Sequence, residues 1–255
     1  MAADQSQSDQ PQYQVIANDL RSRIQRRELL PGAQVPTEKD LAAAYDCSRN
    51  TVRMALLALA NEGLISAGRA RAGRIVRRRE QFVLTHRVEE DLGAARFRGP
   101  DSFADQAHRN GRTPTQEIEV SIVPAGPEWA TRLEVPADER LVRRRRVRFL
   151  DGAPSHLSES YYPLSLVEGT PVLEPQEIVP SVVPLLAALG HRQVRYTDEI
   201  VTRMPGPDEA RLLEIGVGVP VIEHVRTGLS VARPVRLTRT VLPGDRHQLR
   251  YELPG

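Results

Sequence analysis

Cysteine, lysine and aromatic residues are scarce in this chain of 255 residues. It has one cysteine, Cys47, and one lysine, Lys39, and only 4% of its residues are aromatic. A single cysteine excludes an internal disulfide and any metal site built from several cysteines. No apolar run approaches the roughly 18 residues of a membrane-spanning helix, and the first twelve residues are polar rather than signal-like. We therefore expect a cytoplasmic protein with no membrane segment, no bound metal and no cofactor.

Positive charge is concentrated in the first third of the chain. Residues 13–79 contain thirteen Lys and Arg against six Asp and Glu, a net charge of +7. Residues 80–255 contain 22 basic and 25 acidic residues, a net charge of −3. A basic block joined to a mildly acidic one indicates a nucleic-acid-binding domain followed by a domain with another task.

Two short helices with polar start signals are predicted between residues 36 and 62. Thr37 can cap the first, with Asp40 three residues later as an imperfect capping box, and Ser48 can cap the second. The second helix carries one apolar stripe at helical spacing, formed by Val52, Ala55, Leu56 and Leu59.

Three polar residues, Arg49, Asn50 and Arg53, must point away from that stripe. At the start of a helix these side chains can pair with guanine, adenine and phosphate oxygens, as a reader of the DNA major groove requires. The alternative is a three-helix scaffold whose arginines form a solvated face. A generic charged face does not need Ser-Arg-Asn-Thr at a capped helix start, so we favour the DNA reader.

A further helix and a β-hairpin flank these two helices. Apolar residues at helical spacing predict a helix over residues 13–26. Residues 64–66 and 74–77 predict the two strands of a hairpin whose tip carries Arg69 and Arg71. Three helices and a basic hairpin form a winged helix-turn-helix, with the wing placed to reach the minor groove or the phosphates.

Sequence motifs of one family run through this region. They are Leu30-Pro31-Gly32, Pro36-Thr37-Glu38, Leu41-Ala42, Ser48 to Arg53, Ala55-Leu56 and Glu62 to Ile65. Through them residues 13–76 resemble the N-terminal domain of the GntR superfamily of bacterial transcription regulators. The resemblance implies that Lys39, Arg49, Thr51 and Arg53 contact DNA and that Gly73 of the wing approaches the backbone closely. With the pattern above, the candidate DNA-binding residues are Lys39, Ser48, Arg49, Asn50, Thr51, Arg53, Arg69, Arg71, Gly73 and Arg74.

Two positions depart from the family pattern. Asp46 stands in the turn where the family usually has glycine, and Asp tolerates the left-handed geometry that such a turn needs. Residues 71–74 read Arg-Ala-Gly-Arg where the family commonly has Gly-x-Gly-Thr. We therefore expect a stiffer and more basic wing.

The second part of the chain is a duplication. Residues 117–163 recur at 197–243 with a constant offset of 80, so that Arg146 returns as Arg226. Each copy predicts a preceding helix, a strand, a short helix after Gly-Pro and a β-hairpin. Two copies side by side give a six-stranded, largely antiparallel sheet with helices on it, an α+β fold.

A second set of motifs lies in this region, comprising Ser102-Phe103, Gly111 to Pro114, Arg146-Val147-Arg148, Asp151 to Pro154, Ser160 to Pro163 and Gly244 to Arg246. Residues 102–253 thereby resemble the UTRA effector-binding domain of HutC-type GntR regulators, a chorismate-lyase-like fold. The resemblance implies that Arg146 and Arg148 bind an anionic group of a small-molecule effector. It also implies that the site is lined by Ser102, Phe103, Ser158, Ser181, Arg236 and Thr238.

The effector site differs from that of family members that sense phosphorylated amino sugars. This chain has Ser158 and Arg236 where acidic residues are expected, and Val183 and Leu242 where tyrosines are expected. The exchange makes the site more cationic and drier, and we expect a carboxylate or phosphate ligand with an apolar body.

The arginine run from 143 to 148 has a second interpretation. Alternate arginines on a strand face opposite sides, so Arg143 and Arg145 could coat a solvated face. A second nucleic-acid surface is disfavoured because the surrounding domain is net acidic.

These patterns predict a disordered N-terminus (1–12), a winged helix-turn-helix domain (13–79), a linker (80–100) with a strand near 82–84, and a UTRA effector-binding and dimerisation domain (101–253). The family resemblance implies a transcriptional repressor. We expect it to bind a palindromic operator in double-stranded DNA as a homodimer, with an affinity that the effector modulates by population shift. One alternative is a chorismate-lyase-like enzyme with a DNA-binding appendage, although the sequence shows no paired carboxylates and no nucleophile beside a base. The other is a non-specific architectural DNA binder.

Overall fold

The structure, a computed structural model, describes residues 10–66, 73–77, 82–87, 89–91, 94–96, 103–179 and 181–252. The chain divides into two compact units, residues 1–81 with 204–220 and residues 82–203 with 221–255. Most of the N-terminal segment predicted to be disordered lies outside the described residues, but helix α1 already begins at Gln12. Among the described helices, none is both long and apolar enough to cross a membrane.

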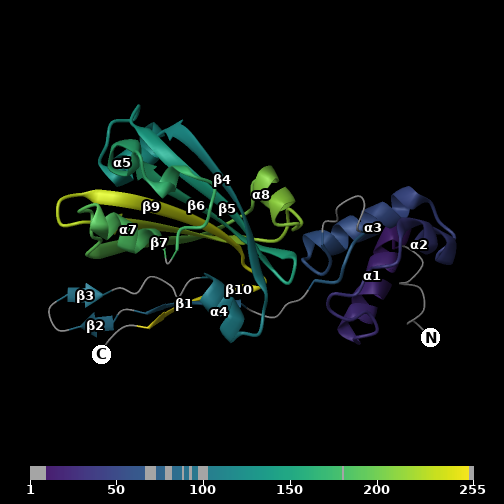
Figure 1. Ribbon diagram of the computed structural model, residues 1–255. Coiled ribbons are helices and arrows are strands. Elements are labelled where there is room, and N and C mark those ends of the chain that lie inside the picture. Colours follow the sequence, from purple (N-terminus) through teal and green to yellow (C-terminus); the bar gives the residue numbers. More distant parts are fainter. Residues whose placement is uncertain are drawn as a thin grey trace. The chain divides into compact units, whose positions relative to one another are not determined.

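The N-terminal part of the first unit contains three helices, α1 (Gln12–Gln25), α2 (Glu38–Ala44) and α3 (Arg49–Asn61) (Figure 1). The apolar stripe predicted for α3 is confirmed, because each of its four residues is at most 2% exposed. The stripe packs against Ile16 and Leu20 of α1, and Cys47 fills a gap beside it. Helix α8 (Pro207–Leu212), in the connection between β7 and β8, groups with this unit.

The second unit contains one six-stranded antiparallel sheet in the order β4-β5-β6-β9-β8-β7. Its strands are β4 (Pro114–Pro124), β5 (Arg140–Leu150), β6 (Ala153–Pro163), β7 (Arg195–Arg203), β8 (Val221–Leu229) and β9 (Pro234–Pro243). The predicted α+β fold with a six-stranded sheet is therefore confirmed.

The strand register confirms the duplication. Ile118 of β4 lies opposite Arg146 of β5, and Asp198 of β7 lies opposite Arg226 of β8, 80 residues later at both positions. We call β4, β5 and β6 the first copy and β7, β8 and β9 the second copy. Equivalent residues thus occupy equivalent places in the hydrogen-bonded ladder.

The two copies also share an irregularity and meet symmetrically. The register of the hairpin shifts after Arg148 in the first copy and after Gly228 in the second. At the junction of the copies, Glu159 of β6 lies opposite Arg239 of β9, which is its own counterpart. A pseudo-twofold axis therefore passes through this pair.

Different helices cover the two faces of the sheet. Helix α5 (Gly126–Leu133) packs Ala130 and Leu133 against Leu141, Tyr161 and Leu237, and we call this side the α5 face. The other side, the α4/α7 face, is covered by α4 (Phe103–Arg109) and α7 (Val182–Ala188) (Figure 1). Short helices α6 (Leu164–Val167) and η1 (Pro171–Leu173) lead towards α7.

The segment that follows the first unit is a strand. Strand β1 (Phe82–Arg87) pairs in parallel with β10 (His247–Glu252), close to the C-terminus. The strand predicted near residues 82–84 is thus confirmed and is longer than expected. A small hairpin, β2 (Glu89–Asp91) with β3 (Ala94–Arg96), follows it.

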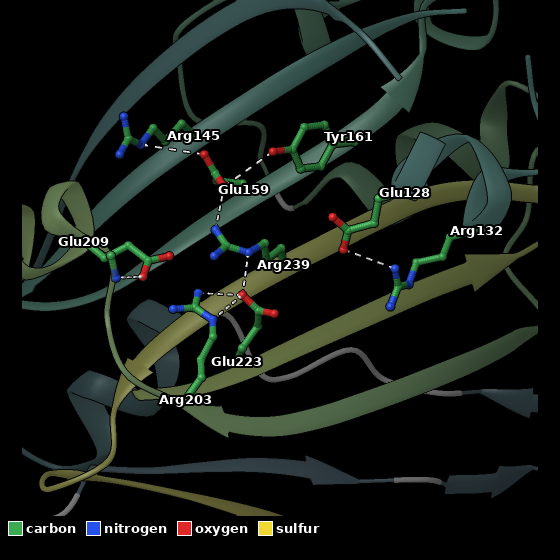
Figure 2. A network of polar contacts seen from close by, with 10 residues as sticks. Glu128, Arg132, Arg145, Glu159, Tyr161, Arg203, Glu209, Glu223 and Arg239 are labelled. Atoms are coloured by element: carbon green, nitrogen blue, oxygen red, sulfur yellow. Dashed lines mark hydrogen bonds and ion pairs between the residues drawn. The ribbon is translucent and has the colours of Figure 1, made fainter. Parts of the chain in front are cut away.

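A chain of alternating charges crosses the α5 face (Figure 2). Glu159 accepts from Arg239 at 3.0 Å and lies 3.7 Å from Arg145. Glu223 accepts from Arg239 at 2.7 Å and from Arg203 at 2.6 Å. The paired groups link five strands, and each of the three arginines lies within 4.0 Å of a glutamate.

Candidate functional site

The start of α3 presents its polar side chains to solvent. Ser48 accepts a hydrogen bond from the Thr51 backbone N–H at 3.1 Å, so the predicted cap is present. Arg49, Asn50 and Arg53 are exposed, whereas the apolar stripe on the same helix is buried. The cap and the stripe together fix which side of the helix these three residues occupy.

The preceding helix is fixed in the same way. Thr37 accepts from the Asp40 N–H at 3.2 Å and donates to the Asp40 carboxylate at 2.7 Å. Lys39 is exposed on α2. Asp46, in the turn before α3, has a φ of +45°, which confirms that it takes the left-handed geometry expected there.

The two arms of the predicted wing pair with each other. Ile65 and Val76 form an antiparallel bridge, and the Ser66 N–H donates to the Ile75 carbonyl at 2.8 Å. Gly73 has a φ of +71°, and a Cβ there would lie 2.9 Å from the Gln34 side chain. The positive φ favours glycine, whereas the exposed Gln34 side chain can move aside. Arg69 and Arg71, predicted at the tip, lie outside the described residues.

Glu38, which the sequence showed only as part of a family motif, acts on both Arg53 and Arg74. The Glu38 carboxylate of α2 lies 3.5 Å from the Arg53 guanidinium. Burial lowers the pKa of Arg74, Glu38 acts against that shift, and the positive charge of Arg53 adds to it. Glu38 therefore forms an ion pair with Arg53 of α3 and acts electrostatically on Arg74 of the wing arm. No spacing rule could find it, because the three residues belong to different elements.

Arg146 lies on the α4/α7 face of the first copy, between hydroxyl groups. Its Nη1 donates to Ser160 Oγ at 3.3 Å, and Ser158 lies opposite it in the ladder. Ser160 in turn lies 3.1 Å from the Thr238 hydroxyl, across the junction of the copies. Ser160 was not among the predicted site residues, although Ser158 and Ser160 share one face by strand alternation.

Arg148 is a further cation on this face. Its guanidinium lies over the Phe103 ring, 4.9 Å from the ring centroid, and the same ring meets His156 edge-on at 5.0 Å. The buried Nε of Arg148 has no hydrogen-bond partner among the described residues. The aromatic ring is thus a weak substitute for a counter-ion.

Both guanidiniums are enclosed by protein without being sealed from solvent. Burial lowers the pKa of Arg146, and burial together with the charge of Arg146 lowers the pKa of Arg148 to about 9. Glu177 acts on both from beyond ion-pair distance and raises both pKa values. Among the described residues, no carboxylate lies within 4.0 Å of either guanidinium, which leaves two enclosed positive charges.

The remaining predicted effector residues lie near this face or outside the described chain. Arg236 donates to the Thr238 hydroxyl at 2.9 Å, and its charge lowers the pKa values of both Arg146 and Arg148. Ser181 caps α7 by accepting from the Val183 N–H at 3.3 Å, so its hydroxyl has a structural partner. Ser102 lies outside the described residues.

Arg143 and Arg145 lie on the opposite, α5 face, as strand alternation predicted. Arg145 belongs to the charge chain in Figure 2, and Arg143 donates to Ser121 Oγ at 3.1 Å and lies 3.5 Å from Glu119. Both are half-buried and paired rather than freely solvated. The α5 face therefore holds matched arginines, and the α4/α7 face of the first copy holds unmatched ones.

Two family models match the chain. Residues 12–75 match the bacterial regulatory proteins of the gntR family, and residues 108–248 match the UTRA domain. The two matches together cover most of the two units described above.

Known proteins resemble the chain over nearly its whole length. It is 32% identical to the uncharacterized HTH-type transcriptional regulator RB1450 of Rhizobium meliloti, over 94% of both chains. It is 26% identical to the histidine utilization repressor of Pseudomonas putida, over 98% of this chain and 94% of that one. The crystal structure of PhnF from Mycobacterium smegmatis shares the fold, with a TM-score of 0.57 and 21% identity over 94% of this chain and 99% of that one. The chain therefore belongs to the gntR family of bacterial transcription regulators, in the HutC-type branch that joins a helix-turn-helix unit to a UTRA domain.

Proposed function

We propose that this regulator is a repressor that binds a palindromic operator as a homodimer and changes its operator affinity when an anionic small molecule binds at Arg146 and Arg148. One observation carries the effector half of the proposal. These two arginines are enclosed and have no carboxylate within ion-pair distance among the described residues, whereas Arg145, Arg203 and Arg239 on the other face are all paired.

The energetic argument follows from burial. An enclosed cation without a counter-ion costs several kcal/mol, so a protein that keeps two of them side by side gains when an anion arrives. The hydroxyl groups of Ser158 and Ser160 lie beside Arg146 and can form neutral hydrogen bonds with a ligand. An anion with an apolar body would meet both the charges and the Phe103 ring.

Aromatic contacts join this site to β1, the strand that follows the first unit in the sequence. Arg148 lies over Phe103, and the Phe103 ring meets the Phe82 ring edge-on at 5.9 Å. Phe82 is the first residue of β1, directly after residues 1–81. An anion that draws Arg148 from the Phe103 ring changes the anchor of β1, and it thereby shifts the population of DNA-binding conformations.

The DNA-binding half rests on the start of α3. Arg49, Asn50 and Arg53 are proposed to read base edges, since the Ser48 cap turns them outward, and Lys39 and Arg74 are proposed to contact phosphates. One small unit contacts few base pairs, so a two-fold dimer reading a palindrome is expected to supply specificity. The exposed Ile200 and Val201 of the outer strand β7 support the proposed dimer. A protein that binds bacterial operators is proposed to act in the cytoplasm.

Selection of bound sequences from random DNA supplies the operator for the first test. Arg49→Ala and Arg53→Ala should each weaken operator binding by about 1–3 kcal/mol while the fold stays intact. Arg211→Ala is the matched control, because Arg211 is an exposed arginine on α8 whose ion pair, among the described residues, is the local one with Asp208. Unchanged gel-shift affinity in both α3 variants would remove them from the reading surface.

The effector test uses a panel of metabolite anions and their neutral analogues. We expect an anion to raise the melting temperature of the full-length protein and to change its operator affinity, and we expect Arg146→Gln and Arg148→Gln to abolish both effects. Mass spectrometry should recover the ligand unchanged, whereas a lyase-type enzyme would convert it. Tight binding of a neutral or cationic ligand that is indifferent to Arg146 would refute the proposal.

A further inference from the structure

The second copy of the repeat already contains the ion pair that the first copy lacks. Arg226 occupies the place of Arg146, and its Nε and Nη2 donate to the two carboxylate oxygens of Asp198, both at 2.6 Å. Asp198 reaches Arg226 from the directly opposite position on the neighbouring strand. Burial alone would raise the pKa of Asp198, but hydrogen bonds from Arg226 and His224 outweigh it and hold that pKa below its usual range.

Ile118 is the residue of the first copy that is equivalent to Asp198 of the second copy. It lies directly opposite Arg146 in the same register, 80 residues earlier. The first copy therefore offers the same guanidinium in the same ladder position, but an apolar side chain replaces the carboxylate.

We propose that the effector carries a carboxylate that binds Arg146 side-on, along the edge formed by Nε and Nη2, in the way that Asp198 binds Arg226. Ile118 is then the residue that determines specificity, since it leaves that edge available and offers an apolar contact to the body of the ligand. This inference rests on the proposed effector site and specifies its chemistry.

The geometry of the second copy supports a carboxylate in particular. A planar group with two oxygens matches the guanidinium fork, and Asp198 shows that the strand spacing admits such a group with two short bonds. Arg148 has no counterpart in the second copy, where Gly228 stands in its place and a Cβ would lie 2.0 Å from Gln193 Oε1. The first copy thus adds a second cation that strengthens binding of an anionic ligand without altering the fork at Arg146.

The test uses acetate as the probe, because it is a free carboxylate of the size of the Asp198 head group. Acetamide is its neutral isostere, and inorganic phosphate is the competing anion. The readout is the NMR signal of the arginine Nε–H groups in the full-length protein, with the Arg226 signal as an internal reference for a carboxylate-bound guanidinium. Acetate should move the Arg146 signal towards the Arg226 signal, and acetamide should not.

Ile118→Asp should reproduce that shift with no acetate present, and it should weaken acetate binding by about tenfold or more, because the site then contains its own carboxylate. Ile118→Asn is the matched control. Asparagine has the shape of aspartate without its charge, so this variant should leave the Arg146 signal at its unshifted position. Asp198→Ala gives the reciprocal experiment: acetate, but not acetamide, should restore the shifted signal of Arg226.

Three results would overturn different parts of the argument. A shift of the Arg146 signal by phosphate, with none by acetate at equal concentration, would reject the carboxylate while leaving an anionic effector. Unaltered acetate binding in Ile118→Asp, or no rescue of Asp198→Ala by acetate, would reject the placement inferred from the second copy. No response of Arg146 or Arg148 to either anion would reject the proposed effector site itself.

Discussion

The two copies of the repeated unit place an arginine at the same point of the sheet and surround it differently. Arg226 forms an ion pair with Asp198 on the neighbouring strand, whereas Ile118 occupies the position opposite Arg146. Strand register is therefore shared between the copies, but charge balance is not. A duplicated sheet can use one copy of a residue for stability and leave the other for a ligand.

Neighbouring equivalent positions also differ in their partners. Position 144 of the first copy and position 224 of the second both hold buried polar side chains, Arg144 and His224. Arg144 donates to main-chain carbonyls, whereas His224 contacts Asp198 and the Tyr251 hydroxyl. The predictions below test whether these pairs differ in role as the structure indicates.

The largest difference is expected between Asp198→Asn and Arg146→Met. Removing the carboxylate leaves Arg226, only 7% exposed, without its counter-ion, and should lower the free energy of unfolding by about 3–5 kcal/mol. Removing the unmatched Arg146 should leave that free energy unchanged or raise it by about 1–4 kcal/mol. Urea denaturation of the full-length protein measures both. Equal destabilisation by the two variants would show that Arg146 is structural and would end the comparison.

A smaller loss is expected for Arg144→Met. The Arg144 guanidinium donates to the Val172 carbonyl at 2.8 Å and to the carbonyls of Pro171, Glu174 and Gln176. Without these bonds the free energy of unfolding should fall by about 2–3 kcal/mol, because buried carbonyls lose a charged donor. Hydrogen exchange should rise first in residues 171–179.

Arg143→Ala is the control for that experiment. Arg143 is the adjacent arginine on the α5 face, where its partners are partly exposed, and we expect a change of about 0.5 kcal/mol or less. If both variants lose the same stability, the four carbonyl contacts of Arg144 contribute little.

Sequence patterns gave accurate predictions where they act locally or repeat. The caps at Thr37 and Ser48 and the left-handed Asp46 follow from short-range chemistry, and the offset of 80 follows from counting. The proposed DNA contacts and effector contacts stay predictions, and the operator-binding and anion-binding experiments test them.

Other features depend on contacts between distant segments. The pairing of β1 with β10 joins residues about 165 positions apart, and β1 has no periodicity that names its partner. Glu38 reaches Arg53 from another helix. The Asp198–Arg226 pair could have been inferred from the repeat, since the cross-strand partner follows once the register is known. The structure was needed to show that Ile118 and Asp198 occupy the same position opposite an arginine in the two copies.

Strand β1 touches both copies, and its two anchors should differ in their effect on regulation. Phe82 packs on Phe103 beside Arg148 of the first copy, and His86 packs beside His224 of the second copy, with ring centroids 5.3 Å apart. Phe82→Leu should keep effector binding but reduce its coupling to operator affinity by about 1–2 kcal/mol. His86→Phe should leave that coupling intact. Operator titrations with and without effector measure it, and equal coupling in wild type and Phe82→Leu would exclude the aromatic path.

The smallest effect concerns pH and the His86 anchor. Burial, with help from the charges of Arg226 and His224, lowers the pKa of His86 to about 3, from an ordinary value of 6.5. Below pH 6.5 the unfolded chain binds a proton that the folded chain does not, so stability contributed by neutral His86 is complete above that pH and declines towards pH 3. At pH 5.5 the loss should be about 1 kcal/mol relative to pH 7.5. His86→Phe should remove this part of the pH dependence, while buried His156, whose pKa is also lowered, contributes equally to both proteins. Urea denaturation at the two pH values measures the difference. An identical pH dependence in both proteins would show that His86 can be protonated in the folded protein, because the contact of β1 with the second copy opens locally.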